Sequence, residues 1–221
     1  MTADTFQRAR SADHKAQRRE AILAAAERLA VRDGVRQVTL ADIAALVGIH
    51  KSALLRYFAT REEIFLELTG RAWTVWAQQT GAALAETEAH DADAVAAALA
   101  DGFATRPLLC DLIPHTALNL ERHASLAAVH EYKLTSLGAV ERVATALSTP
   151  LPELDADQRR ELVSVVALLA GAMYQIATPP PALAELYRAH PALGHALLDL
   201  PDRLRRAARV TIAGLITLAD E

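Results

Sequence analysis

The sequence predicts an all-α protein in which a small N-terminal helical domain precedes a larger helical one. Ala and Leu dominate a composition that is 52% hydrophobic, and both residues favour helices. Long runs that alternate apolar and polar residues, as half-buried strands do, are scarce. Glycines and prolines instead separate segments whose apolar residues recur every three or four positions, the spacing of an amphipathic helix. A length of 221 residues suits a small domain joined to a larger one.

The N-terminal segment, residues 1–17, is polar and carries scattered basic side chains, so we expect a flexible basic arm there. A first helix is predicted from Arg18 to Arg32, with Gly34 as its stop. Five apolar side chains share one face of that helix: Ile22, Leu23, Ala26, Leu29 and Ala30.

Two short helices follow. Thr39 is predicted to cap the first, Leu40–Leu46, with Asp42 completing a capping box from the third helical position. Gly48 then breaks the helix. The second short helix is expected from His50 to Phe58.

A long helix is predicted from Thr60, its cap, to about Ala85, because Glu63 completes a second capping box and the apolar pattern continues. This places the helix-turn-helix domain at residues 18–62 and the larger domain at 63–221. Prolines and capping residues punctuate the larger domain. Its further predicted helices cover residues 91–103, 107–118, 123–148, 155–177, 182–189 and 202–219.

Charge is unevenly distributed along the chain. Residues 1–60 hold ten Lys or Arg and six Asp or Glu, a balance of +4, whereas residues 61–221 hold thirteen and twenty-one, a balance of −8. A basic N-terminal part on an acidic remainder is compatible with a polyanionic partner for the N-terminal part, and equally with an ordinary solvated surface.

Compartment signals favour the cytoplasm. The single cysteine, Cys110, cannot form an internal disulfide. The N-terminal stretch has no apolar core of the kind a secretory signal needs. The longest apolar stretch runs only from Leu162 to Ala177 and includes Ser164 and Gln175. A membrane span needs about 20 residues, so we expect a buried helix instead.

The two short helices and the three-residue turn between them form a helix-turn-helix pattern. In this motif the second helix must present polar residues at its start to reach base edges in the major groove, and an apolar inward face further on. His50, Lys51 and Ser52 meet the first requirement. Arg56 and Tyr57 fall on the outer side, where they can contact phosphates.

The motif residues are Gly34, T-L-A-D-I-A at 39–44, Gly48, Phe58 and R-E-E-I at 61–64. With these spacings, the stretch from Arg18 to Phe65 resembles the TetR family of bacterial transcriptional regulators. The resemblance implies a double-stranded DNA operator, usually repression, and no enzymatic activity or cofactor. The DNA contacts expected from the motif and the resemblance are Thr39, His50, Lys51, Ser52, Ala53, Arg56, Tyr57 and Arg61.

This chain departs from the family pattern at several of these positions. Leu55 and Arg56 stand where many members have two aromatic residues, Tyr57 stands where they often have His, and Arg61 replaces a Lys. Leu55 can offer a base only an apolar contact, such as one with a thymine methyl. The operator sequence is therefore not predicted.

The resemblance also implies a homodimer and a small hydrophobic effector bound in the larger domain. Within the helices at 155–177 and 202–219, the segments Leu162–Ala177 and Val210–Leu218 are apolar nearly all round. They suit a four-helix interface between two subunits or, alternatively, a monomer core. Breaks at Pro107 and Pro114 could open a cavity. The candidate effector contacts are Phe103, Cys110, His115, Asn119, His123, Tyr132, Met173 and Tyr174.

Two other function classes compete with this interpretation. An all-helical enzyme acting on a small hydrophobic substrate could use Asp111, His115 and Glu121, although no nucleophile or phosphate-loop motif accompanies them. A protein-binding adaptor would explain the apolar helices but not the capped, basic helix-turn-helix. We reject a metal site at His115, His123 and His130, because no cysteine pair or carboxylate motif supports their spacing.

Overall fold

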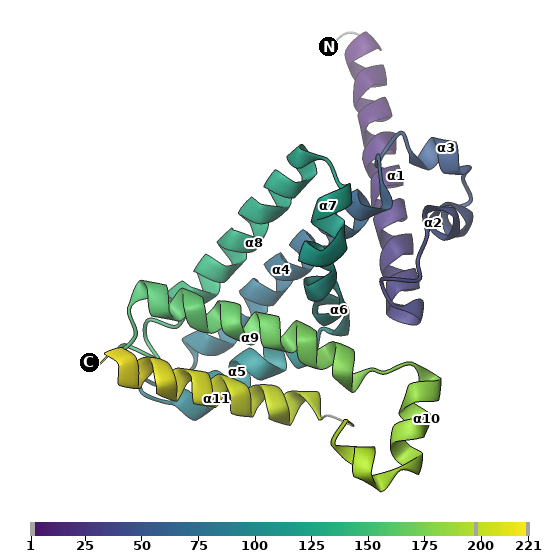
Figure 1. Cartoon of the computed structure of the whole chain (residues 1–221). Coiled ribbons are helices and arrows are strands. Elements are labelled where there is room, and N and C mark those ends of the chain that lie inside the picture. Colours follow the sequence, from purple (N-terminus) through teal and green to yellow (C-terminus); the bar gives the residue numbers. More distant parts are fainter. Residues whose placement is uncertain (1–2, 197–198, 220–221) are drawn as a thin grey trace.

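The computed structural model describes the backbone of residues 3–196 and 199–219, and the side chains of residues 13–190, 192–194 and 199–219. Every regular element in this part of the chain is helical, which confirms the predicted all-α class (Figure 1). We call α1 to α3 with their connecting turns the head, and α4 to α11 the body.

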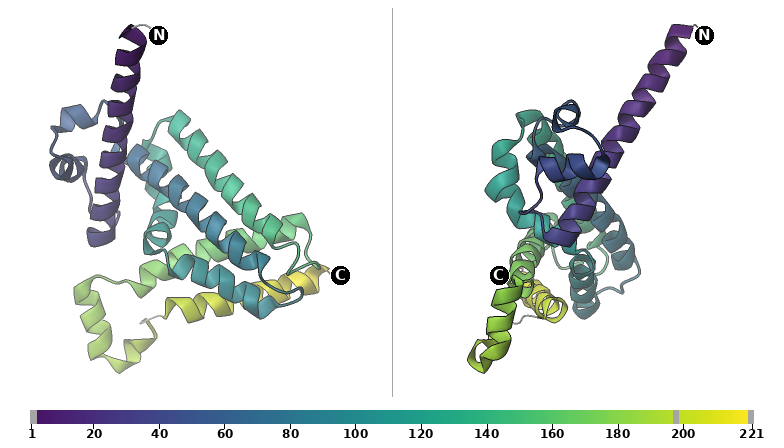
Figure 2. Two further views of the ribbon diagram at one scale, coloured as in Figure 1. Left: turned by 180° about the vertical axis from the view of Figure 1, so that it is seen from behind. Right: turned by 90° about the vertical axis from the view of Figure 1, so that its right-hand side faces the viewer.

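The head consists of α1 (Ala3–Asp33), α2 (Leu40–Val47) and α3 (Lys51–Leu54). Helix α1 begins at Ala3 instead of Arg18, so from Ala3 onward a continuous helix replaces the flexible arm expected for residues 1–17; residues 1–2 lie outside the described part. The segment contains no Gly or Pro to end a helix. Figure 2 shows this extension projecting beyond the rest of the molecule.

Helix α3 is shorter than the helix predicted from His50 to Phe58. After Leu54 the backbone tightens into turns, in which Arg56 N–H donates to Ala53 O at 3.3 Å and Tyr57 N–H to Leu54 O at 2.8 Å. These bonds span three residues, where α-helical bonds span four. Tightening brings Phe58 into the head core, where it is 3% exposed.

The body continues directly from the head through α4 (Arg61–Ala85), which runs from one domain into the other (Figure 1). Helix α4 packs against α8, and α5 packs against α11, while α9 contacts α6, α8 and α11. The body elements after α4 are α5 (Ala92–Ala104), α6 (Pro107–His115), the π-helical turn η1 (Thr116–Leu120), α7 (Glu121–His123), α8 (Leu126–Ala146), α9 (Ala156–Ala177), α10 (Pro181–Ala189), the 3₁₀ turn η2 (Pro191–Ala196) and α11 (Leu200–Ala219).

Two body elements differ from prediction. The helix expected at 107–118 ends as α6 at His115 and continues into η1, after Pro114 has removed one backbone donor from the helix. The helix expected at 123–148 begins instead at Leu126, where the Ser125 hydroxyl accepts from the Ala128 N–H.

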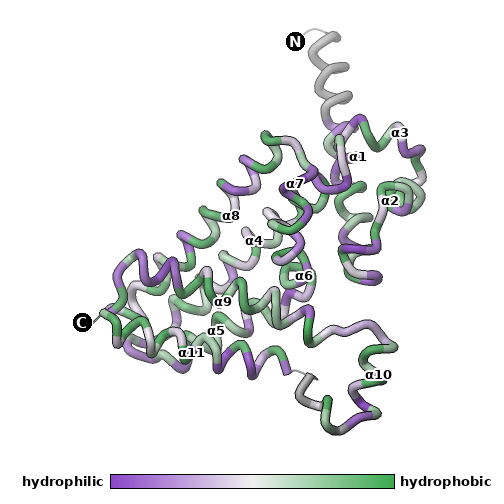
Figure 3. The backbone as a smooth tube through the Cα atoms, in the orientation of Figure 1, coloured by the Kyte–Doolittle hydropathy of each residue, from purple (hydrophilic) through white to green (hydrophobic). Residues whose placement is uncertain are grey.

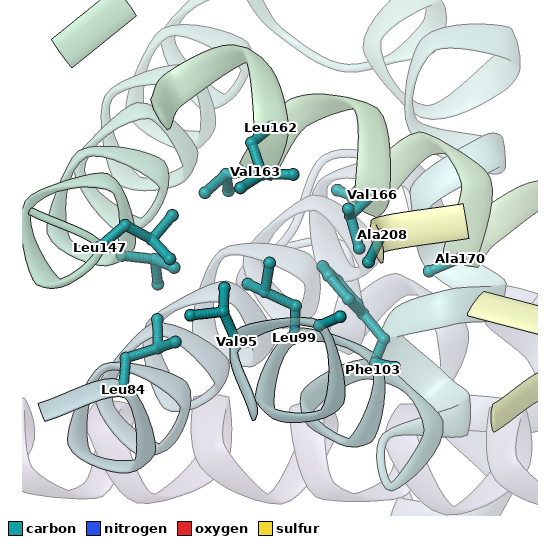
Figure 4. Packing of buried hydrophobic residues seen from close by; sticks show 14 of the residues in the cluster. Leu84, Val95, Leu99, Phe103, Leu147, Leu162, Val163, Val166, Ala170 and Ala208 are labelled. Carbon is teal, nitrogen blue, oxygen red and sulfur yellow. The ribbon is translucent and has the colours of Figure 1, made fainter. Parts of the chain in front are cut away.

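Aromatic and aliphatic side chains fill the body core. Trp76 stacks on Phe103 with ring centroids 4.7 Å apart, and Trp73 meets Trp76 edge-on at 5.2 Å. Figure 4 shows aliphatic side chains of α5 and α9, among them Leu99 and Val166, beside Phe103. The core thus ties α4 to the helices packed around it.

Helix α9 is the one helix of the described chain whose length and composition would allow it to cross a membrane. In the fold it packs on four body helices, α5, α6, α8 and α11, and buries six residues, among them Leu162, Val166 and Ala170. The apolar residues of α9 and of the C-terminal half of α11 are visible in Figure 3.

Candidate DNA-binding surface

A reciprocal cap fixes the start of α2. The Thr39 hydroxyl accepts from Asp42 N–H at 3.2 Å, and Asp42 Oδ2 accepts from Thr39 N–H at 2.9 Å. These bonds form the predicted capping box, and the hydrogen bonds from Thr39 lower the pKa of Asp42. At the other end, Gly48 adopts φ 73°, a left-handed conformation that suits glycine. The start of α3 is therefore held in place by the backbone of α2.

Helix α3 presents its first turn to solvent. His50, Lys51 and Ser52 are exposed, and Ala53 is half-buried. The ring of His50 caps its own helix, with Nδ1 accepting from Ser52 N–H at 3.3 Å and lying 2.8 Å from Ser52 Oγ. Nε2 is left as the outward polar atom of His50, and Lys51 has no polar partner among the described residues.

A basic cleft lies beside α3, between its C-terminal turn and α1. It has a volume of about 710 Å³. Arg56 is exposed at its edge, and Tyr57 is half-buried in its wall. Lys15 and Arg18 of α1 supply two more cations, and none of the described residues that line the cleft is a carboxylate. Sequence reasoning did not place Arg18 among the expected DNA contacts, because the continuation of α1 before Arg18 was not predicted.

Arg61, one of the expected DNA contacts, stabilises the head–body junction instead. Arg61 donates through Nε to Val38 O and through Nη2 to Val35 O, and its guanidinium lies 4.6 Å from the centroid of the Phe65 ring. These internal bonds occupy the side chain that was expected to contact phosphate. We therefore leave Arg61 out of the DNA contacts proposed below.

Arg19 of α1 stabilises the turn that follows α3, where Tyr57 and Phe58 lie. Its guanidinium lies 4.0 Å from the centroid of the Phe58 ring, donates to Tyr57 O at 3.0 Å and pairs with Glu67 of α4. The turn after α3 is thereby tied to α1 and α4 together. No local sequence pattern predicts these contacts of Arg19, since its partners are far away in the chain.

The eight candidate effector residues do not converge on one site. Phe103 and Cys110 are fully buried in the body core, whereas Asn119 and His123 are exposed. The Cys110 thiol donates to Phe103 O at 3.3 Å, and burial raises its pKa to about 12. The remaining four, His115, Tyr132, Met173 and Tyr174, are half-buried.

The acid–base groups weighed for an enzyme are engaged in structural contacts. His115 Nε2 lies 3.6 Å from Asp111 Oδ1, and Glu121 pairs with Lys133 of α8 at 2.7 Å. Asp111 also accepts hydrogen bonds from the head and from α9. Among the described residues, no three His, Cys, Asp or Glu side chains gather as metal ligands would.

Sequence reasoning missed two polar groups in the body core. Trp76 Nε1 and Thr80 Oγ1 are buried without a hydrogen-bond partner among the described residues. They lie one turn apart on α4 and both face Gly102 of α5, where an added Cβ would lie 3.1 and 2.5 Å from them. A tryptophan and a threonine four residues apart on one helix face were the available signal.

Comparison with known proteins agrees with this geometry. Residues 22–68 match the family model described as bacterial regulatory proteins, tetR family, and residues 70–219 match the tetracyclin repressor-like C-terminal domain. A 57-residue stretch is 42% identical to the HTH-type transcriptional repressor BepR of Brucella suis biovar 1 (strain 1330). That stretch spans 26% of this chain and only 27% of the repressor's length.

Solved structures share the fold over nearly the whole chain. The fatty acid degradation regulator FadR from Bacillus halodurans aligns with a TM-score of 0.56 at 13% identity, covering 90% of this chain and 96% of that one. A transcriptional regulator from Rhodococcus sp. Rha1 aligns with a TM-score of 0.54 at 19% identity, covering 92% and 98%. Because the C-terminal model covers residues 70–219, more than half of the 221 residues, this chain belongs to the TetR family of bacterial regulatory proteins.

Proposed function

We propose that this protein is a sequence-specific transcriptional repressor, which binds a palindromic operator as a homodimer and leaves it when a small hydrophobic effector binds the body. Regulators of this family bind DNA and act as dimers with small-molecule ligands. The observation that carries the proposal is the exposed polar first turn of α3 beside a cleft lined by three cations.

The first turn of α3 and the cleft would make different kinds of contact with DNA. Lys51, Ser52 and the outward edge of His50 stand where the N-terminal end of a recognition helix meets base edges. Lys15, Arg18 and Arg56 line a cleft that suits backbone phosphates, which set orientation without reading sequence. Thr39 and Tyr57 flank the same surface, and Ala53 faces it only in part.

The dimer would form through α9 and α11, which pack side by side (Figure 1). Each carries large apolar side chains that nothing in the described chain covers. Leu168 is 67% exposed, Ile176 50% and Val210 64%. Pairing these faces in two copies buries them and produces a two-fold interface. Two recognition helices about 34–36 Å apart can then enter successive major grooves.

The effector would act in the body core. The regulator itself would be cytoplasmic and would hold no resident cofactor. Trp76 Nε1 and Thr80 Oγ1 are buried polar atoms without partners, beside the ring of Phe103. Such atoms gain a bond when a ligand supplies a matching polar group. A mostly apolar molecule with one acceptor would enter only an arrangement of the body that opens this place, because a Cβ at Gly102 would already lie 2.5 Å from Thr80 Oγ1. It would shift DNA affinity only by preferring one arrangement of the body.

Selection of duplexes from a random pool tests the proposal, since a palindromic product gives the operator and its half-site spacing together. Binding to the selected duplex should weaken steeply with salt, as release of counterions from phosphates requires. Failure to enrich any duplex, or binding that does not respond to salt, would contradict the proposal.

Single substitutions then locate the surface. Lys51→Ala and Arg56→Ala should both weaken binding, and Arg56→Ala should also reduce the salt slope by about one, because a phosphate contact is lost. Arg142→Ala is a matched control, because Arg142 is exposed on α8 and has no partner among the described residues. Equal effects of all three substitutions would show that net charge alone drives binding.

A further inference from the structure

The turn that connects α1 to α2, residues 34–38, is held from two sides by the body. Asp111 of α6 accepts the Val35 N–H through Oδ2 at 2.8 Å. Arg61 of α4 donates to the carbonyl oxygens of Val35 and Val38. The donor and the acceptor of one peptide segment are thus both satisfied by side chains from outside the head.

The carboxylate of Asp111 also reaches a third element. Its Oδ1 accepts from Gln175 Nε2 of α9 at 2.9 Å. The side chain is only 13% exposed, so water competes weakly for these bonds. Asp111 therefore connects the head to α6 and α9 through two oxygens of one rigid group.

Close packing couples α6 to α9 near this carboxylate. A Cβ added at Gly171 of α9 would lie 2.9 Å from Ile113 Cγ2 and 3.0 Å from Pro114 Cδ of α6. At such contact distances one helix cannot shift toward the other without displacing it. On the head side, the turn that Asp111 holds leads within a few residues to Thr39, the cap of α2.

We propose that Asp111 is a positioning residue, which sets the placement of the helix-turn-helix relative to α6 and α9 and passes their displacement to the DNA-binding surface. The predicted effect of Asp111 on DNA affinity rests on the proposed function. The predicted placement of the head on the body does not, because it is measured without DNA.

The first experiment measures the distance between head and body with a pair of nitroxide labels at Ala45→Cys and Thr145→Cys. Both positions are exposed, on α2 and near the end of α8. Native Cys110 can stay, because it is fully buried and its thiol pKa is raised to about 12. Dilution with unlabelled chains keeps the measured pairs within one subunit.

The distance distribution should be narrow in the parent protein and broader or shifted with Asp111→Ala. Asp111→Asn should restore most of the narrow distribution, since the amide oxygen still accepts from Val35 N–H and Gln175 can rotate to accept from the amide nitrogen. Asp101→Ala is the control, because Asp101 lies on α5 and pairs only within the body, with Arg205. A purely stabilising role would lower the melting temperature with Asp111→Ala but leave the distribution unchanged, and that result overturns the proposal.

The second experiment compares affinities for the selected duplex. Asp111→Ala should weaken binding by roughly fivefold or more with an unchanged salt slope, since no phosphate contact is lost. A parent protein that binds no duplex contradicts the proposed function, whereas unchanged affinity of the Ala variant contradicts this inference.

Amide hydrogen exchange in the parent protein tests the hydrogen bond from Val35 N–H to Asp111 without any variant. The Val35 N–H should exchange more slowly than the N–H of Arg36, and equal rates would overturn the inference.

Discussion

At the scale of single residues, two arginines five positions apart have different environments. Arg56 is exposed at the cleft beside α3, whereas the Arg61 side chain is 16% exposed and bonded to two carbonyl oxygens. Their residue type and their closeness to the recognition helix do not distinguish them. What distinguishes them is the turn at residues 34–38, which folds against Arg61.

Arg61→Ala should therefore act on stability first. Removing a charged donor from two carbonyl groups should lower the free energy of unfolding by about 2 kcal/mol, measured by urea denaturation. Arg61→Lys should also be destabilising, because a single ammonium cannot reproduce the planar fork. Arg56→Ala should leave the urea midpoint unchanged while weakening DNA binding. A stable Arg61→Lys protein with weakened DNA binding would instead favour a phosphate contact at this position.

Asp111 makes a second prediction at this scale. Burial alone would raise the pKa of this carboxyl, but the contact from His115 and the hydrogen bonds from Val35 N–H and Gln175 together bring it below its ordinary value. A lowered pKa in the folded protein adds stability above the unfolded pKa of about 4, and that stability is lost as pH falls through the folded value.

Unfolding measured from pH 7 downward should show this loss below about pH 4 in the parent protein. Asp111→Asn should lack this part of the acid sensitivity, because Asn does not titrate. Other carboxyls with lowered pKa values, such as Asp42 and Glu63, stay in both proteins, so the difference between the two curves isolates Asp111. Parallel curves would contradict the assignment.

Sequence reasoning identified residues whose roles follow from local spacing. The Thr39 cap, the exposure of Lys51 and the burial of Phe58 follow from a cap, a turn and a helical face. The roles of Asp111 and Arg61 depend on partners 76 and 26 positions away, and a single sequence does not show such pairs. The same limit explains why the effector candidates, chosen by residue type, are scattered in the fold.

At the scale of elements, the glycine at the end of α2 controls the entry into α3. Gly48 adopts φ 73°, and a Cβ added there would meet nothing within 4 Å, so the cost of a side chain is conformational. Gly48→Ala should reduce stability by about 1 kcal/mol in thermal or urea unfolding.

Gly138 offers a matched comparison for Gly48. It lies inside α8, where an added Cβ also meets nothing within 4 Å. Gly138→Ala should stabilise the protein by about 0.5–1 kcal/mol, because alanine is the better helix former. Effects of the same sign at both glycines would contradict the conformational explanation.

Most helices could be predicted because capping boxes and prolines mark their ends. The extension of α1 to Ala3 was not predicted, since a helix without an apolar face has no periodic signal. The change from α6 to the π-helical turn was also missed. Pro114 lies inside α6 and close to Gly171 of α9, and a single sequence does not show such a contact.

At the scale of the whole molecule, the exposed faces of α9 and α11 predict the assembly. Leu168→Glu places a charge at the centre of the proposed interface and should weaken dimerisation by at least about tenfold, as measured by sedimentation. Leu137→Glu on α8 is the control, since Leu137 is 63% exposed and lies off that face. A parent protein that sediments as a monomer at micromolar concentration would contradict the dimer.

The core of the head contains side chains that the body supplies. Leu112 of α6 and Leu120 of η1 are 0% and 1% exposed within the cluster that also holds Ile22, Leu54 and Phe65. The border between the two family matches, at residues 68 and 70, is therefore not a border between independently folding units. A fragment ending there would lack part of its own interior. A chimaera that grafts this DNA-reading unit onto another regulator would need to carry α6 and η1 along with it.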